Sequence, residues 1–213
     1  MVAQSPVSMS VVPGTVLLDP QWLTERIADM GVSWGTGDSR VSGTLWWCMA
    51  ASSLVDAVVG AQVGMRPEVD PVLERITCEV RPDGGIERVL PVDDGGNAAE
   101  PVGHALRHTL SRVIPVVAEV CGAGVAALWA IVADAIGNRA LDAGDQEAGA
   151  RLARDVAGRL PVPRFSDIGG RTFVRRISCC LVFEVPGCEM CTSCPKRPAA
   201  QREQLLAELA ARG

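Results

Sequence analysis

The order of hydrophobic and polar residues predicts more helices than strands. Asp19 and Pro20 form an N-cap followed by a first-turn proline, and they predict a helix from Gln21 to about Met30 that ends at Gly31. From Leu45 to Val59 the chain is apolar on almost every side of a helical projection. Such a segment is typical of a central buried helix.

Two strand-like stretches flank a turn sequence. The first runs from Leu73 to Arg81, the second runs from Ile86 to Val92, and Pro82-Asp83-Gly84-Gly85 lies between them. Because glycine and aspartate tolerate the backbone angles of tight turns, this arrangement predicts a β-hairpin.

The later part of the chain is again helical in pattern. Helices are expected from Pro101, from near Val125, from Gln146 to Leu160 with Asp145 as cap, and from Ala199 to Arg212. The longest apolar run, Val120 to Ala133, has fourteen residues. A membrane span needs about 20, so this run is expected to be a buried core helix and no membrane span is predicted.

These patterns predict an α+β fold that is predominantly α-helical, with a helical body, a small β-hairpin and a cysteine-rich tail. Pro161-Val162-Pro163 and Gly169-Gly170 interrupt the helical pattern and mark the expected boundary. The predicted parts are a body at 1–163 and a C-terminal segment at 164–213.

Composition and charge exclude some classes of function. The chain has 213 residues, 48% hydrophobic and 21% charged, with a net charge of −5. An acidic balance argues against non-specific nucleic-acid binding, so no nucleic-acid partner is expected. The first residues show neither a basic region nor a long apolar run, so no secretory signal is expected. We therefore expect a soluble, cytoplasmic protein.

The eight cysteines fall into two groups. Cys48, Cys78 and Cys121 stand alone in apolar surroundings, where a thiol acts as a small hydrophobic side chain. The other five lie within sixteen residues, at 179, 180, 188, 191 and 194. In a reducing compartment, such a cluster favours metal binding or redox chemistry over structural disulfides.

Four of these thiolates suit an iron–sulfur cluster. Cys191 and Cys194 form a C-x2-C pair, and Pro186-Gly187 supplies a chain reversal that could return this pair to Cys179 and Cys180. Neighbouring side chains on a strand point to opposite faces. The adjacent cysteines must therefore occupy a distorted turn if both bind one cluster.

Two alternatives remain open on spacing alone. Cys188, Cys191 and Cys194 form C-x2-C-x2-C before a proline, which would suit a [4Fe-4S] cluster with Cys179 or Cys180 as fourth ligand. A structural zinc or a thiol–disulfide site is the other alternative, although zinc sites usually pair two C-x2-C knuckles.

The C-C-x10-C-x2-C arrangement resembles the C-terminal signature of FhuF-type ferric siderophore reductases. The neighbouring Arg176, Leu181-Val182-Phe183 and Pro186-Gly187 are similar to that segment, and Trp129 to Asn138 is similar in character to the family's larger domain. The resemblance implies a [2Fe-2S] cluster on Cys179, Cys180, Cys191 and Cys194. It also implies a ferric siderophore substrate, of hydroxamate type, bound by the helical body. Cys188 is an addition to the family pattern, and its replacement is expected to be tolerated.

Charge supports redox chemistry in the tail. Residues 171–197 include five basic and two acidic side chains, in a chain that is acidic as a whole. Cations near an anionic cluster stabilise its reduced form and attract anionic partners.

Three other motifs have simpler structural explanations. Residues 122–127 match G-x-G-x-x-A, but small residues at a helix–helix turn explain them better than a dinucleotide site. His104 and His108 share a helix face without a third ligand, so we expect solvated or capping roles. The tryptophans Trp34, Trp46, Trp47 and Trp129 are expected in the core or in a pocket wall.

The sequence therefore favours a ferric siderophore reductase that transfers one electron and releases Fe(II). With no nucleotide site, electrons would come from a donor protein or a small reductant. A zinc-stabilised or iron–sulfur sensor module, and an electron carrier without its own substrate, are the alternative functions.

Overall fold

The structure is a computed structural model that describes residues 9–66, 68–92 and 100–212. The helices are α1 (Pro20–Trp34), α2 (Ser39–Gln62), α3 (Val102–Cys121), α4 (Val125–Asp142), α5 (Gln146–Val156) and α6 (Ala199–Ala210). The strands are β1 (Ser10–Pro13), β2 (Ile76–Val80), β3 (Ile86–Pro91), β4 (Phe165–Ile168) and β5 (Arg171–Val174). Short 3-10 turns occur at η1 (Gly14–Leu18), η2 (Leu73–Arg75) and η3 (Val182–Glu184). The predicted α+β, predominantly helical class is confirmed.

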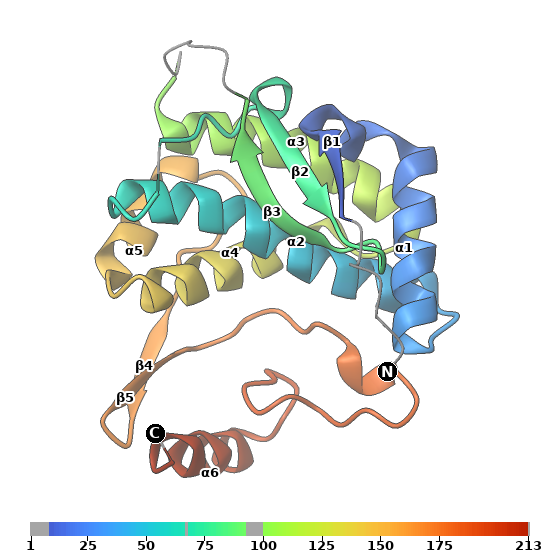
Figure 1. Cartoon of the computed structure of the whole chain (residues 1–213). Coiled ribbons are helices and arrows are strands. Elements are labelled where there is room, and N and C mark those ends of the chain that lie inside the picture. Colours follow the sequence, from blue (N-terminus) through green and yellow to red (C-terminus); the bar gives the residue numbers. More distant parts are fainter. Residues whose placement is uncertain (1–8, 67, 93–99, 213) are drawn as a thin grey trace, which may run out of the picture.

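Helix α2 lies at the centre of the fold, in contact with α1, α3, α4 and β3 (Figure 1). Trp46 and Trp47 on α2 are fully buried, and their indole N–H groups donate to the carbonyls of Gly84 and Leu128 at 2.9 and 3.0 Å. By length and composition alone α2 could cross a membrane, but 67% of its most apolar window is buried inside the fold. It is therefore the core helix that the apolar pattern predicts.

A three-stranded antiparallel sheet, ordered β1-β2-β3, covers one side of α2. Strand β2 buries Ile76, Cys78 and Val80 and alternates them with half-buried residues, as expected for a sheet with one face on the core. The predicted hairpin is thus confirmed. The sequence interpretation was wrong at its start, because Leu73–Arg75 form the turn η2, and it missed β1 altogether.

The first helix ends four residues later than predicted, at Gly35 and not at Gly31. Asp19 caps α1 as predicted, and its carboxylate accepts from the N–H groups of Gln21 and Trp22. The helix does not stop at Gly31; it ends at Gly35, which takes the left-handed conformation with φ 70°. Gly31 instead allows close packing, because a Cβ there would lie 2.9 Å from the carbonyl oxygen of Thr36.

The apolar run from Val120 to Ala133 is not a single helix. Helix α3 ends at Cys121, and α4 begins at Val125 after a short glycine-containing turn. The G-x-G-x-x-A match therefore follows a helix and joins two helices, as expected. Helix α5 ends at Val156 rather than Leu160, because the next two residues have positive φ.

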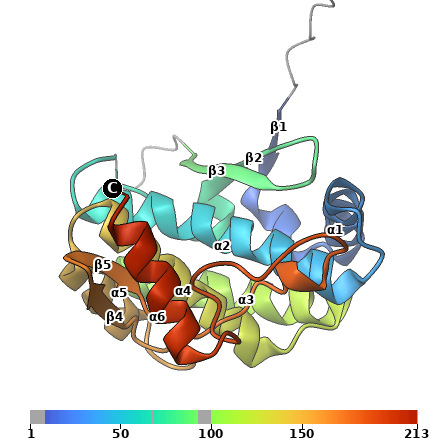
Figure 2. The ribbon, with the colours of Figure 1, turned by 90° about the horizontal axis from the view of Figure 1, so that it is seen from below.

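After residue 163 the chain has no α-helix until α6. Here "helical body" denotes the described residues up to 163, and "C-terminal segment" denotes residues 164–212. The segment opens with the antiparallel hairpin β4–β5, turned by Gly169 and Gly170, where the sequence indicated only a break. It continues as irregular chain and ends in α6, so that it lies along one side of the body, across α2 and α4 (Figures 1 and 2).

Candidate functional site

The four predicted ligand cysteines lie in the irregular chain between β5 and α6, where the C-terminal segment crosses the helical body (Figure 2). Cys194 is buried, and Cys179, Cys180 and Cys191 are half-buried. Cys179 and Cys180 also pack against the hydrophobic core of the body. The site therefore lies at the junction between the two parts of the chain.

A distorted turn follows the adjacent cysteines, as the sequence requires. Leu181 is in the left-handed conformation, with φ 62° and ψ 10°, although it carries a side chain. Such a conformation costs a non-glycine residue about 1–2 kcal/mol. The backbone of Leu181 and Val182 in this turn acts to lower the pKa of the Cys179 and Cys180 thiols, respectively. Amide hydrogen bonds to sulfur are a common device for stabilising anionic iron–sulfur clusters.

The second cysteine pair is held by a separate turn. The Cys194 N–H donates to the carbonyl of Cys191 at 3.1 Å, which closes the C-x2-C loop. Arg197 secures the same loop, since its Nε donates to the Cys191 carbonyl at 3.1 Å and its Nη2 donates to the carbonyl of Met190. Gly187, with φ 78°, reverses the chain before this loop, where the sequence predicted a reversal.

The two turns bring the sulfurs together as two pairs. The Sγ atoms of Cys179 and Cys194 are 3.8 Å apart, and the thiols of Cys180 and Cys191 are close enough to shift each other's pKa. Metal–sulfur bonds of about 2.3 Å at a tetrahedral angle place two thiolates about 3.8 Å apart. The adjacent cysteines thus belong to different pairs, and the Cys179–Cys194 pair has the spacing that suits one iron.

A binuclear cluster fits this arrangement better than a single zinc ion. Zinc in a four-cysteine site needs all its sulfurs around one point. Within residues 9–66, 68–92 and 100–212, no three His, Cys, Asp or Glu side chains gather around one such point. Cys188 has no place in either sulfur pair, so the fourth-ligand scheme for a [4Fe-4S] cluster also fits poorly.

Arg176 shapes the electrostatics of the site. Its Nη1 donates to the Sγ of Cys191 at 3.5 Å, and its side chain is only 17% exposed. A hydrogen bond from the Cys191 thiol, with help from the Val182 N–H and from Arg176, lowers the pKa of Cys180 to about 5. The same hydrogen bond raises the pKa of Cys191, and burial raises that of Cys179. These contacts stabilise the thiolate form of Cys180, which is the form that binds metal.

Asp134 of α4 anchors the segment to the body. Its carboxylate, 4% exposed as a residue, accepts from the backbone N–H groups of Ile177 and Ser178 at 3.0 and 2.9 Å. It also accepts from the Ser178 hydroxyl and from Arg176 Nε. Buried carboxylates need partners, and here one carboxylate fixes the three residues that precede Cys179.

Sequence reasoning missed Asp134. It lies within the apolar stretch Trp129 to Asn138, where every neighbour suggests a core helix. An acidic side chain inside such a stretch is itself a signal, since aspartate is almost never fully buried without a partner. The sequence could show that a partner exists but could not identify the backbone of residues 177 and 178.

The three isolated cysteines are neutral thiols in the fold. Burial raises the pKa of both Cys48 and Cys78 to about 12, and it also raises the pKa of Cys121. Cys78 and Cys121 are buried core residues as predicted. Cys48 differs, because it is half-buried on α2 and close enough to Cys180 and Arg176 to interact electrostatically with them.

The other candidate residues lie away from this junction. His104 and His108 are both exposed on α3, in agreement with a solvated role. Trp46, Trp47 and Trp129 are buried, but Trp34, at the end of α1, is 39% exposed. Trp34 therefore does not lie in the core, which was one of the two positions expected for it.

Comparison with known families agrees with the geometry. Residues 176–196 match the family described as the FhuF 2Fe-2S C-terminal domain. This range begins at Arg176 and includes all five clustered cysteines. No curated protein matched the chain. Residues 176–196 are therefore similar to the FhuF 2Fe-2S C-terminal domain, the clustered cysteines fit its cluster-binding motif, and the match points to a [2Fe-2S] cluster as the cofactor.

Proposed function

We propose that the protein is a cytoplasmic ferric siderophore reductase whose cluster is held by Cys179, Cys180, Cys191 and Cys194. The observation that carries this proposal is the division of these four sulfurs into two pairs, within a segment that matches a [2Fe-2S] domain. When bound, the cluster supplies one-electron chemistry. The cysteines are ligands in this proposal and act neither as nucleophiles nor as a disulfide.

One electron is enough to release the iron. Fe(III) is small and highly charged and is held tightly by anionic oxygen chelators, whereas Fe(II) has a lower charge density and binds them weakly. The electron that converts Fe(III) to Fe(II) comes from an external donor, either a redox protein or a small reductant. A reducing compartment keeps the thiols available as ligands.

Residues of the chain favour this electron transfer in two ways. Arg176 and the N–H groups of Leu181 and Val182 place positive charge beside the sulfurs, which stabilises the cluster in its more negative, reduced state. Asp134 keeps Arg176 in position and holds the loop against α4. Both features favour fast, reversible transfer with little movement of the protein.

The test is a reoxidation experiment under anaerobic conditions. Dithionite-reduced, desalted protein is mixed with a ferric hydroxamate chelate, and the visible spectrum is followed with an Fe(II) trap present. We expect reoxidation of the cluster and release of about one Fe(II) per cluster, because the [2Fe-2S] centre passes one electron.

Two results would separate the alternative functions from this one. A cluster that stays reduced in the presence of the ferric chelate, yet is reoxidised by a ferredoxin or by a dye, would indicate an electron carrier or sensor. Colourless protein that contains one zinc ion and no acid-labile sulfide would indicate a structural module.

A further inference from the structure

A cation–π contact joins the two turns that carry the clustered cysteines. The ammonium nitrogen of Lys196 lies 4.9 Å from the centroid of the Phe183 ring. Phe183 is in η3, three residues after Cys180, and Lys196 is two residues after Cys194. Because Cys180 and Cys194 belong to different sulfur pairs, this contact connects the two halves of the site through a positive charge.

The ring beneath the ammonium is fixed to the helical body. Phe183 is half-buried and packs against the hydrophobic core. Its neighbour Glu184 forms an ion pair with Arg40, near the start of α2. An aromatic face attracts a cation by about 0.5–1 kcal/mol at an exposed site. Phe183 therefore gives a defined position to a lysine side chain that is otherwise exposed to solvent.

The charge of Lys196 is not neutralised by a carboxylate. Within the residues that the structure describes, no acidic side chain forms an ion pair with Lys196, and Glu184 is already paired with Arg40. The Cα atoms of Lys196 and Cys194 are at most about 7 Å apart, because two residues span no more. Reduction adds one electron, and so one negative charge, to a [2Fe-2S] cluster. A cation this close to a ligand stabilises the reduced state.

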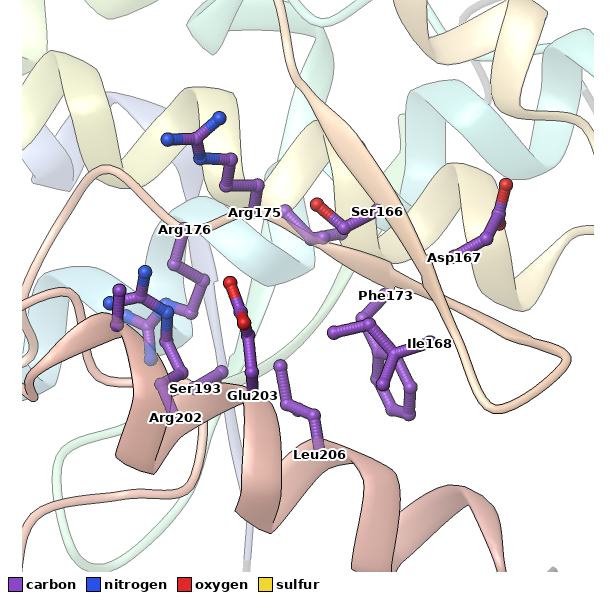
Figure 3. A pocket seen from close by; sticks show the side chains of 12 residues that line it. Ser166, Asp167, Ile168, Phe173, Arg175, Arg176, Ser193, Arg202, Glu203 and Leu206 are labelled. Carbon is purple, nitrogen blue, oxygen red and sulfur yellow. The ribbon is translucent and has the colours of Figure 1, made fainter.

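The C-x2-C loop is held in place without Lys196. Arg197 donates to two carbonyls of this loop, and Arg202 on α6 donates to the carbonyl of Arg197 at 3.3 Å. Arg202, Arg176 and Ser193 line a cavity of about 450 Å³ between the β4–β5 hairpin and α6, and Lys196 does not (Figure 3). Since the loop is fastened from the α6 side and Lys196 is exposed, removal of the lysine charge should leave the loop folded.

We propose that Lys196 tunes the reduction potential of the cluster and that Phe183 is the positioning residue that holds its ammonium group. The positive charge favours the electron on the cluster, so it assists transfer from the external donor and lowers the driving force of transfer to Fe(III). This inference rests on the cluster ligands of the proposed function, and it does not depend on the identity of the substrate.

The position of the ammonium group can be measured directly, because the chain has one lysine. Protein that carries no added lysine, labelled with carbon-13 at lysine Cε, gives one Cε–Hε NMR signal. In the oxidised, cluster-loaded protein the ring current of Phe183 should shift this signal upfield, and Phe183→Leu should move it back. Reduction should broaden the wild-type signal more, because paramagnetic broadening falls steeply with distance. The same signal position in both proteins would overturn the positioning role.

The potential is measured by dye-mediated redox titration, in which the electron comes from the mediator and no ferric chelate is present. Lys196→Gln should lower the equilibrium constant for reduction about threefold, which is about 28 mV for one electron. Lys196→Arg keeps the charge and should retain the wild-type potential, and Phe183→Leu should give an intermediate value. Arg171→Gln is the matched control with no expected shift, because Arg171 also lies over a ring, at 5.3 Å from Phe173, but in the hairpin.

The outcomes separate this inference from the proposed function. A wild-type potential in Lys196→Gln, with or without a loss of iron, would overturn the tuning role and leave the reductase proposal standing. An equal shift in Arg171→Gln would show that total charge, and not the position of Lys196, sets the potential. If the potential falls in Lys196→Gln and is restored in Lys196→Arg, but the reduced wild-type cluster does not reduce a ferric chelate, the tuning role is confirmed and the reductase proposal fails.

Discussion

Different interactions stabilise the helical body and the C-terminal segment. In the body, α2 alone buries fifteen residues, and the core continues through α3, α4 and the sheet. In the segment the buried hydrophobic side chains are few: Val174, Leu181, Val185, Cys194 and Leu206. The segment relies instead on polar anchors such as Asp134 and, when loaded, on its metal centre. We therefore expect the body to keep its fold without metal and the geometry of the segment to depend on what it binds.

The largest expected effect comes from removing a ligand. Cys180→Ser or Cys194→Ser should abolish the visible absorption and the acid-labile sulfide, because each variant leaves one iron with a single thiolate from the chain. Iron and sulfide analysis after anaerobic purification measures this. Far-UV circular dichroism should change little, because α1 to α5 belong to the body.

Cys188→Ser is the matched control within the same loop. Cys188 is half-buried and outside both sulfur pairs, so its variant should retain iron and sulfide at the wild-type level. Loss of the cluster in Cys188→Ser, together with an intact cluster in Cys180→Ser, would contradict the pairing seen in the structure and favour the [4Fe-4S] register.

Iron removal should loosen the segment and leave the body folded. We expect trypsin to cleave the iron-free protein after Arg175 or Lys196 more than about a hundredfold faster than the loaded protein, because metal coordination is a major part of the segment's stability. Mass spectrometry of a digestion time course identifies the sites. Equal cleavage rates would show that Asp134 and the apolar contacts fix the segment without metal.

Replacing Asp134, which anchors the segment to the body, should have a smaller effect on iron retention than removing a cysteine. Asp134→Asn keeps the shape of the side chain but removes the charge opposite Arg176. We expect the free energy that holds the segment against the body to fall by about 2 kcal/mol, the contribution of a hydrogen bond to a charged group. That loss corresponds to about thirtyfold faster release of iron to a chelator. Asp142→Asn, on the exposed end of the same helix, is the control. An unchanged release rate in Asp134→Asn would mean that the segment docks without this carboxylate.

The same contrast explains how far the sequence could predict the molecule. Apolar periodicity predicted α2, the β2–β3 hairpin and α6, because burial against a core leaves a pattern that can be read locally. The β4–β5 hairpin was missed because Gly169-Gly170 was interpreted as a boundary, although paired glycines also form tight hairpin turns. The four cysteines were predicted as ligands from their spacing, and the structure places them near one another in two pairs. Asp134 was not found, because its partners lie more than forty residues away along the chain.

The smallest predicted effect is a pH dependence within the body. The chain contains no tyrosine, and Lys196 is its one lysine, so cysteines are the main side chains that titrate between pH 8 and 11. Burial raises the pKa of Cys78 from its ordinary value of 9.0 to about 12. The folded state therefore keeps a proton that the unfolded chain loses above pH 9. Stability is unaffected below that pH and falls as the pH rises from about 9 to about 12.

The expected contribution of Cys78 is about 1.4 kcal/mol lost at pH 10, because one pKa unit corresponds to 1.36 kcal/mol. Urea unfolding of the wild-type protein and of Cys78→Val, each at pH 7.5 and pH 10, measures it. The variant replaces a buried thiol with a side chain of similar volume that cannot ionise, so its unfolding free energy should fall less between the two pH values. Since Cys78 lies on β2, far along the chain from the clustered cysteines, iron content should be the same in both proteins. Equal losses in the two proteins would show that the thiol of Cys78 is not desolvated in the folded body, and that the core beneath the sheet is more open than its burial indicates.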